Sequence, residues 1–373
     1  MFVNYPDSNF YFAGCGLNLL FQKQITMQTI RTALLSYGMS GKVFHAPFIQ
    51  LHPGFQLAGA WERSKQIIGE SYPGVTSYPT LERILADDSI DLVIVNTPTA
   101  THYEYAKKAL LAGKDIVVEK AFTTTVAEAV ELKNVAEKVN RKISVYQNRR
   151  WDSDFKTVKK IIGEGWLGDL NEAEIHFERF KPQLSPKQHK EVKSPGAGLL
   201  KDLGPHIIDS AICLFGFPEA VFADIRFTRQ HTVVDDWFDI LLYYKNLRVR
   251  LKGGLLVRES LPGFVIHGSK GSFLKNRTDV QEIDLVAGKV PNRSNWGTEP
   301  ESEQGLLHTE KDGNIIREKV PSLQGNYYDY YDGVYKALTE DKPMPVTVDD
   351  GINVMRIIES AMQSWNEKKL INL

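Results

Sequence analysis

The sequence predicts two α/β domains: a doubly wound parallel sheet, followed by an α+β domain with an open, mainly antiparallel sheet. Three observations support this prediction. The chain has 373 residues, which is too long for one typical domain. Apolar strands alternate with helical segments in the first part of the chain, as in a parallel sheet covered on both faces. Strands with hairpin spacing follow, which is typical of an antiparallel sheet.

Five apolar runs alternate with helical spacing in the first domain, predicted over residues 28–148. Each run is short and bounded by turn residues, as expected for strands buried on both faces. Right-handed crossovers between such strands produce a doubly wound sheet. The predicted strands are 30–36, 56–61, 92–96, 116–119 and 143–146, and the predicted helices are 40–51, 100–112 and 126–139.

The pattern changes after Trp151 and predicts a second domain over residues 149–373. Its open sheet face needs cover, so we expect a homodimer or homotetramer that forms through this sheet. Residues 279–303 are polar and rich in turn residues, and we expect a loop there. The predicted strands are 170–180, 220–228, 238–244, 248–256, 264–267 and 272–274, and the predicted helices are 155–163, 205–215, 327–338 and 349–365.

Composition argues against several classes of partner. The formal net charge is −1, so no global field would attract nucleic acid or an anionic membrane. No apolar run is long enough to span a bilayer. The two cysteines, Cys15 and Cys213, exclude a disulfide framework and fit a reducing, cytoplasmic compartment. Residues 1–27 are expected to be a leader outside the domains, either disordered or translated from an upstream start, with the working chain beginning at Met27.

A glycine-containing turn follows the first strand. It has the G-x-G-x-x-G frame, with serine at the first position, and a helix is predicted directly after it. The second glycine allows the backbone to approach a pyrophosphate, and the third allows close packing of helix on strand. The turn therefore predicts a dinucleotide site of the Rossmann type, although a purely structural turn is the alternative. The candidate residues are Ser36, Gly38, Met39, Ser40 and Gly41.

The end of the second strand bears on the form of the dinucleotide. Glu62 could accept hydrogen bonds from the adenine ribose, which favours NAD. Arg63, Ser64 and Lys65 could instead bind a 2′-phosphate, which favours NADP. An ordinary charged surface turn would look the same, so the sequence leaves NAD and NADP both open.

Two further segments carry candidate catalytic groups. Lys120 follows a predicted parallel strand, at the sheet edge where ligands bind in such folds. Asp202 and His206 are four residues apart, so a helical path would place them on one face. A histidine of near-neutral pKa is suited to accept the proton of a hydroxyl group, and Asp202 or Asp209 could orient it. The alternatives are a capping aspartate with a core histidine, or a two-residue metal site; no third ligand is apparent, so we expect no metal.

Taken together, these segments resemble the Gfo/Idh/MocA oxidoreductase family over residues 28–373, because they occur in the family's order. The family's E-K-P motif appears here as Glu119-Lys120-Ala121, and its D-x-G-x-H segment as 202–206, before Leu214-Phe215-Gly216. Alanine replaces the family's proline, which helps to set the lysine's backbone, sometimes through a cis bond. The segments at 40–47 and 146–152 are similar to the branch that contains NADP-dependent scyllo-inositol dehydrogenases.

The resemblance implies Lys120, Asp202 and His206 as the catalytic group. It also implies that residues at or after the ends of the predicted strands 92–96, 116–119 and 143–146 lie beside the cofactor or substrate. Packing or capping roles for these residues are the alternatives. These further candidates are Thr97, Pro98, His102, Glu119, Asn148, Arg149 and Trp151.

We therefore expect an NAD(P)-dependent enzyme that transfers a hydride between nicotinamide and a secondary hydroxyl or ketone of a cyclic polyol or sugar. In this hypothesis His206 accepts the proton, Lys120 steadies the developing alkoxide and Asp202 orients both. Lys120 as the base is one alternative. Others are a family member acting on a glycoside or a dipyrrole, and a non-catalytic NAD(P)-binding sensor.

Overall fold

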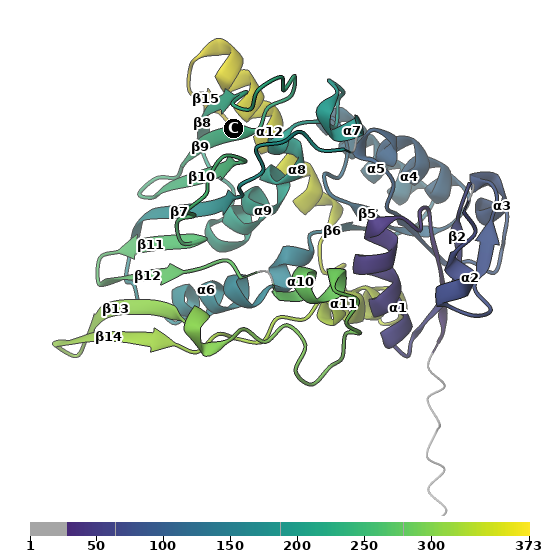
Figure 1. Ribbon diagram of the computed structural model, residues 1–373, viewed down its shortest axis with the longest axis horizontal. Helices are drawn as coiled ribbons and strands as arrows, with labels where there is room; N and C mark the ends of the chain where they lie inside the picture. The colour runs from purple at the N-terminus through teal and green to yellow at the C-terminus, as the bar shows by residue number, and fades with distance from the viewer. Residues whose placement is uncertain (1–27, 64, 187, 279) are drawn as a thin grey trace, which may run out of the picture.

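The computed structural model describes residues 28–63, 65–186, 188–278 and 280–373. Two sheets lie side by side, and helices pack between and around them (Figure 1). The expectation of a leader over residues 1–27, together with Cys15 and Ser64, lies outside the described residues. None of the described helices is both long and apolar enough to cross a bilayer.

The first sheet has six parallel strands in the order β3-β2-β1-β4-β5-β6. This order confirms the doubly wound prediction, and it places the change of winding direction between β1 and β4. The short elements between residues 68 and 85 were not predicted. The strands are β1 (Ile30–Leu34), β2 (Phe55–Trp61), β3 (Thr76–Tyr78), β4 (Leu92–Val95), β5 (Asp115–Glu119) and β6 (Ile143–Tyr146).

The helices of the first domain begin directly after turn or capping residues in the sequence. The first opens as a π-turn, Gly41–His45, and continues as α1 (Ala46–Leu51). Thr125 caps α5 by accepting from the backbone N–H of Glu128, whose carboxylate bonds back, so this helix starts at Val126. The others are α2 (Ile68–Ser71), α3 (Leu81–Leu85) and α4 (His102–Leu111), and α5 spans Val126–Lys138.

The second sheet has nine strands in the order β14-β13-β12-β11-β7-β10-β9-β8-β15. Its neighbours are antiparallel except for β7 and β10, which are parallel. The last hairpin, β13 and β14, was not predicted, because its alternation is mostly polar. The strands are β7 (Leu170–Glu178), β8 (Ala220–Arg226), β9 (Trp237–Tyr243), β10 (Arg248–Gly254), β11 (Phe264–Gly268), β12 (Gly271–Lys275), β13 (Gly305–Lys311), β14 (Asn314–Val320) and β15 (Ile371–Asn372).

Helices cover one face of the second sheet and leave the other face open (Figure 1). Buried residues alternate with exposed ones along most of β8 and with half-buried ones along β9, as expected for a half-covered sheet. The prediction of a loop over 279–303 was wrong, because α10 (Val280–Val286) and a 3₁₀ turn, Glu301–Glu303, lie there. The remaining helices are α6 (Ser153–Gly163), α7 (Gln188–Glu191), α8 (Leu199–Asp202), α9 (Gly204–Phe215), α11 (Tyr328–Thr339) and α12 (Val348–Glu367).

A buried ion pair joins the two halves beside the last strand of the first sheet. The Arg150 guanidinium donates to both carboxylate oxygens of Asp209 on α9, at 2.8 and 2.6 Å. It also lies 3.3 Å from the carboxylate of Asp350 on α12. The Asp209 side chain is only 3% exposed, so this contact fixes α9 against the end of the Rossmann sheet.

Candidate active site

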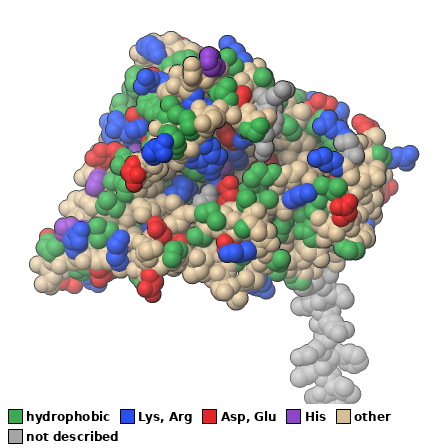
Figure 2. Space-filling view, viewed as in Figure 1, with side chains coloured by type: hydrophobic (Ala, Val, Ile, Leu, Met, Phe, Trp, Pro, Cys, Tyr) green, Lys and Arg blue, Asp and Glu red, His purple; other side chains and the backbone are tan. Residues whose placement is uncertain are grey.

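A cavity of about 780 Å³ opens between the two sheets. Its walls come from the carboxyl ends of β4 and β5, the end of β7, and the α8–α9 segment. Figure 2 shows this hollow near the centre of the molecule, with Lys and Arg side chains gathered in it. Carboxyl ends of parallel strands are the ligand-binding edge of a doubly wound sheet. Of the predicted catalytic residues, Lys120, Asp202 and His206 all line the cavity.

The glycine turn forms one wall, where Met39 and Ser40 line the cavity. Asn96, after β4, binds the turn through both ends of its amide: its oxygen accepts from Ser36 N at 3.0 Å and its nitrogen donates to Ser36 O at 2.7 Å. The Ser36 hydroxyl accepts from Gly38 N at 3.2 Å. The serine side chain thus stabilises a turn for which the usual motif uses glycine.

The turn fits a dinucleotide phosphate. A Cβ on Gly41 would lie 2.3 Å from the Ser36 carbonyl oxygen, so only glycine permits this close approach of helix and strand. A Cβ on Gly38 would lie 3.3 Å from the Ser36 hydroxyl. The first turn of a helix leaves backbone N–H groups without intrahelical acceptors, and these attract phosphate oxygens. Residues 36–41 would hold the pyrophosphate.

At the end of β2, the carboxylate of Glu62 does not face an open ribose site. Its two oxygens accept from Ile67 N at 2.9 Å and Ile68 N at 3.1 Å, which caps α2, and the residue is 7% exposed. Arg63 and Lys65 are exposed beyond it. The carboxylate is therefore turned away, so its charge would not oppose a 2′-phosphate bound here.

Glu119 lines the cavity and contacts the glycine turn. It accepts from the Ser40 hydroxyl at 2.5 Å and contacts His45 Nε2 at 3.0 Å. The other nitrogen of His45 lies 2.6 Å from the Tyr331 hydroxyl. Burial alone would raise the pKa of Glu119, but the contacts to His45 and Ser40 and the charge of Lys120 outweigh it and lower this pKa to about 2. The carboxylate thus stays ionised and anchors the turn to β5.

Lys120 follows β5 and reaches across the cavity to the α8–α9 segment. Its ammonium donates to the Asp202 carbonyl at 2.7 Å and to the Asp202 carboxylate at 3.0 Å. The second carboxylate oxygen accepts from Lys190 at 2.7 Å. Burial would raise the pKa of Asp202, but the two lysines lower it well below its usual range. The peptide bond between Lys120 and Ala121 is cis.

His206 is 6% exposed and lies in the first turn of α9, with its ring tilted against that of Phe177 at a centroid distance of 6.1 Å. Within the described residues its Nδ1 has no hydrogen-bond partner. Burial, together with the positive charges of Lys120 and Arg149, lowers the pKa of His206 well below its ordinary value. The imidazole is therefore neutral at physiological pH and can accept a proton.

Two expectations about this segment were wrong. Asp202 ends α8 and Gly204 begins α9, so Asp202 and His206 are not on one continuous helix. Asp209 does not support the imidazole, because Arg150 occupies both of its carboxylate oxygens. Pro205 takes the place in the first helical turn that its missing N–H allows.

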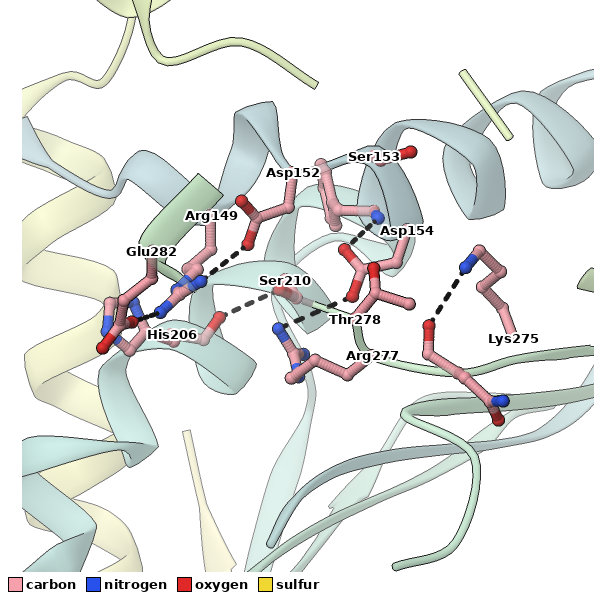
Figure 3. Close-up of polar contacts among 12 residues, drawn as sticks. Arg149, Asp152, Ser153, Asp154, His206, Ser210, Lys275, Arg277, Thr278 and Glu282 are labelled. Atoms are coloured by element: carbon pink, nitrogen blue, oxygen red, sulfur yellow. Dashed lines mark hydrogen bonds and ion pairs between the residues drawn. The ribbon is translucent and has the colours of Figure 1, made fainter. Parts of the chain in front are cut away.

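The remaining predicted residues divide between the cavity wall and its support. Thr97, Pro98, Asn148 and Arg149 line the cavity. The Arg149 guanidinium lies between the carboxylates of Asp152, at 3.1 Å, and Glu282 (Figure 3).

The two ring-bearing candidates, His102 and Trp151, do not line the cavity. His102 is 1% exposed, and its ring nitrogens each lie 2.8 Å from a carbonyl oxygen, those of Thr97 and Ala121. Trp151 packs edge-on against Tyr330, with ring centroids 5.2 Å apart, and does not line the cavity. Both side chains support the wall from behind.

Sequence reasoning missed Asn96, His45 and Lys190. Asn96 directly follows a buried strand, and its position at the strand end could have identified it as a site residue. His45 was noticed only as part of a similar segment, and nothing in the local pattern links it to Glu119. Lys190 lies on α7, a short helix that the sequence patterns did not identify, and it contacts Asp202 only through the fold. Among the described residues, no group of three or more His, Cys, Asp or Glu is arranged to hold a metal ion.

Family comparisons agree with this geometry. Residues 30–147 match the oxidoreductase family's NAD-binding Rossmann fold, and residues 159–373 match its C-terminal alpha/beta domain. The chain belongs to the Gfo/Idh/MocA family. It is an NAD(P)-dependent oxidoreductase that acts on CH–OH groups.

Individual relatives cover nearly the whole chain. The NADP⁺-dependent scyllo-inositol 2-dehydrogenase IolW of Bacillus subtilis is 38% identical over 347 residues, which is 93% of this chain and 97% of that protein. A solved Bacteroides fragilis protein, described only as an oxidoreductase, is 45% identical with a TM-score of 0.85, covering 93% of this chain and all of that one. The structure of YvaA from Bacillus subtilis has a TM-score of 0.89 at 38% identity, covering 93% and 99%.

Proposed function

We propose that this protein interconverts a secondary hydroxyl and a ketone on a cyclic polyol or sugar, using NADP or NAD. The observation that carries the proposal is the convergence of Lys120, Asp202 and His206 in one cavity whose opposite wall is the glycine turn. The relative named as a scyllo-inositol 2-dehydrogenase supports the same class of substrate.

Each side chain has a distinct role in this proposal. His206, neutral because its pKa is depressed, accepts the hydroxyl proton during oxidation. Lys120 donates to the same oxygen and stabilises its negative charge as the proton leaves. Asp202 holds the ammonium at 3.0 Å and so positions Lys120 rather than the imidazole. When bound, the nicotinamide supplies the acceptor or donor of the hydride.

The test compares His206→Ala with Lys120→Met, following reduced-nicotinamide absorbance with scyllo-inositol and other polyols. We expect each change to lower turnover by about a hundredfold or more, without loss of cofactor binding. With His206 as the base, the rate should be flat through neutral pH and fall only on the acid side. A rate that keeps rising toward alkaline pH in the wild type would make Lys120 the base. Losses below about tenfold in both variants would show that the site is misplaced.

We further propose that NADP is the preferred form. Glu62 caps α2 with both of its oxygens, so its charge faces away while Arg63 and Lys65 remain exposed. Arg63→Ser should lower kcat/KM for NADP⁺ by roughly tenfold or more, because a charge-assisted bond to the 2′-phosphate is lost. The value for NAD⁺ in the same variant is the control. Equal loss with both cofactors would contradict the preference.

Assembly through the open face of the second sheet is also proposed. Phe222 on β8 is 40% exposed, and Leu241 and Tyr243 on β9 lie on the same uncovered face. An exposed apolar face of this kind is typical of an interface. Light scattering should give a dimer or tetramer, and Phe222→Arg should shift the mass toward the monomer. A monomer at micromolar concentration would refute this assembly.

A further inference from the structure

One wall of the cavity is formed by the end of β7 and the residues after it. Phe177, Arg179 and Lys181 are two residues apart along an extended backbone, so their side chains point the same way, and all three line the cavity. Backbone bonds fix this segment: Arg179 N donates to Gly254 O at 2.9 Å and Lys181 N to Leu255 O at 2.7 Å.

The two cations on this wall lack carboxylate partners. The Arg179 guanidinium lies over the Phe177 ring, 4.9 Å from its centroid. Within the described residues, neither Arg179 nor Lys181 has an ion pair within 4.0 Å. The acids of the lining already have partners. Four are in ion pairs, with His45 for Glu119, Arg229 for Glu191, Arg149 for Glu282, and two lysines for Asp202. The fifth, Asp235, accepts from the backbone N–H of Leu200 at 2.7 Å.

These cations lie beside the proposed catalytic group. Lys190, whose ammonium contacts Asp202 at 2.7 Å, is one of the charges that act on Lys181. Burial and the nearby charges of Arg179 and Lys190 lower the pKa of Lys181. The cations therefore repel one another, and a bound anion would relieve that repulsion.

The dinucleotide phosphates do not account for this cluster. They are expected at the glycine turn, where Met39 and Ser40 line the cavity, and a 2′-phosphate is expected beyond β2. Arg179 and Lys181 instead follow β7 of the second sheet, and they line the cavity together with Asp202 and His206 of the α8–α9 segment. Figure 1 shows β7, α8 and α9 close together. The anion they suit belongs to the substrate.

We propose that the substrate carries an anionic group, a carboxylate or a phosphate ester, which Arg179 and Lys181 bind while its reacting hydroxyl lies between Lys120 and His206. This inference rests on the proposed function and narrows its substrate class. The planar fork of Arg179 matches two oxygens of one group, and Lys181 adds a point charge. A neutral inositol would leave both cations unpaired in the cleft.

The first experiment compares substrates with the full-length protein and NADP⁺ or NAD⁺. The probes are scyllo-inositol and myo-inositol as neutral polyols, D-galacturonate and D-gluconate as carboxylates, and D-glucose 6-phosphate as a phosphate ester. We expect at least one anionic compound to exceed both neutral polyols in kcat/KM by tenfold or more. Whether a carboxylate or the phosphate is turned over identifies the kind of anion.

The second experiment uses Arg179→Gln and Lys181→Gln, with Arg226→Gln as the matched control. Arg226 also lies over an aromatic ring, 5.4 Å from the centroid of Trp237, but it is exposed on β8 and does not line the cavity. Each test variant should lower the ratio of kcat/KM for the anionic over the neutral substrate by about tenfold, mostly through KM. The control should leave this ratio unchanged.

The outcomes separate this inference from the function on which it rests. The anionic-substrate inference is overturned if neutral polyols are turned over at least as well as the anions and Arg179→Gln leaves the anionic-to-neutral ratio of kcat/KM unchanged. That result would leave the proposed dehydrogenase function intact. No turnover of any compound by a protein that binds cofactor overturns the proposed function. In that case, calorimetry with D-galacturonate and D-glucose 6-phosphate tests whether the cavity binds an anion. Binding that is lost in Arg179→Gln but kept in Arg226→Gln supports an anion site. If neither compound binds, the anion site is refuted.

Discussion

Behind the Rossmann wall of the cavity, His45 and His102 each have a polar neighbour at both ring nitrogens, whereas His206 on the opposite wall does not. His45 lies between Tyr331 and Glu119, and His102 between two carbonyl oxygens. His206 Nδ1 has no partner within the described residues. A ring with a polar neighbour at each nitrogen is held in place and supports its surroundings, whereas the buried Nδ1 of His206 lacks such an anchor.

The same contrast holds for charges. Glu119 and Glu62 are bound by neighbours on the Rossmann side, but Arg179 and Lys181 on the other side have no carboxylate within 4.0 Å in the described chain. The cofactor half is therefore preorganised by its own contacts, and the substrate half keeps charges that a ligand would complete. Four substitutions test this difference.

The largest effect is expected from His206→Leu. Turnover should fall by about a hundredfold or more, but the free energy of unfolding should change by less than about 1 kcal/mol, because no bonded partner is orphaned. The depressed pKa of His206 means that the unfolded state takes up its proton first, so wild-type stability falls as pH drops below about 6.5. The variant has no imidazole at this position, so its stability should not show this part of the decrease at acid pH. Urea unfolding between pH 7 and 5, together with turnover, measures both.

His102→Leu should show the opposite balance. It removes the donor between two carbonyl oxygens, those of Thr97 and Ala121, and should lower the free energy of unfolding by about 1–3 kcal/mol. Comparing the unfolding midpoints of the two histidine variants in urea tests the contrast directly. A larger loss of stability in His206→Leu than in His102→Leu would contradict the contrast between the two histidines.

Gly41→Ala should weaken cofactor binding by roughly tenfold or more, because its Cβ would lie 2.3 Å from the Ser36 carbonyl oxygen and the turn would have to open. Gly163→Ala is the control, since a Cβ there meets nothing within 4 Å. Fluorescence titration with NADPH measures the affinity. Unchanged binding in Gly41→Ala would mean that the turn does not hold the dinucleotide.

The last substitution, Glu119→Gln, tests stability against acid. Its folded pKa of about 2 lies below the ordinary 4.5, so its contribution is full above pH 4.5 and is lost as pH falls toward 2. The variant should be less stable at pH 7 by about 1–3 kcal/mol, with a shallower decline in that acid window. Unfolding by urea at pH 7, 4.5 and 3 measures this, and parallel curves for variant and wild type would contradict it.

Much of the scaffold could be predicted from local patterns. The apolar runs identified the strands of the Rossmann half because each is buried on both faces, and the turn with Gly38 and Gly41 follows from a strand, two glycines and a helix. The hairpin β13–β14 was missed because its sequence is largely polar, and α10 because its seven residues lie in a stretch that is otherwise polar and rich in turn residues. Both are stabilised by the elements they pack against. Lys120, Asp202 and His206 were found through family resemblance as much as through spacing.

The sequence by itself determined which elements form, since hydrophobic period, turn residues and caps act over a few residues. It also determined which chemical groups stand at the strand ends. Only the tertiary structure decided their partners: that Asp202 holds Lys120 rather than His206, that Asp209 binds Arg150, that Glu62 faces α2, and that Arg179 and Lys181 remain unpaired. The Asp202–Lys120 and Asp209–Arg150 pairs join residues 82 and 59 positions apart. Burial and Coulomb interactions, which set the pKa values, depend on distance in space rather than along the chain.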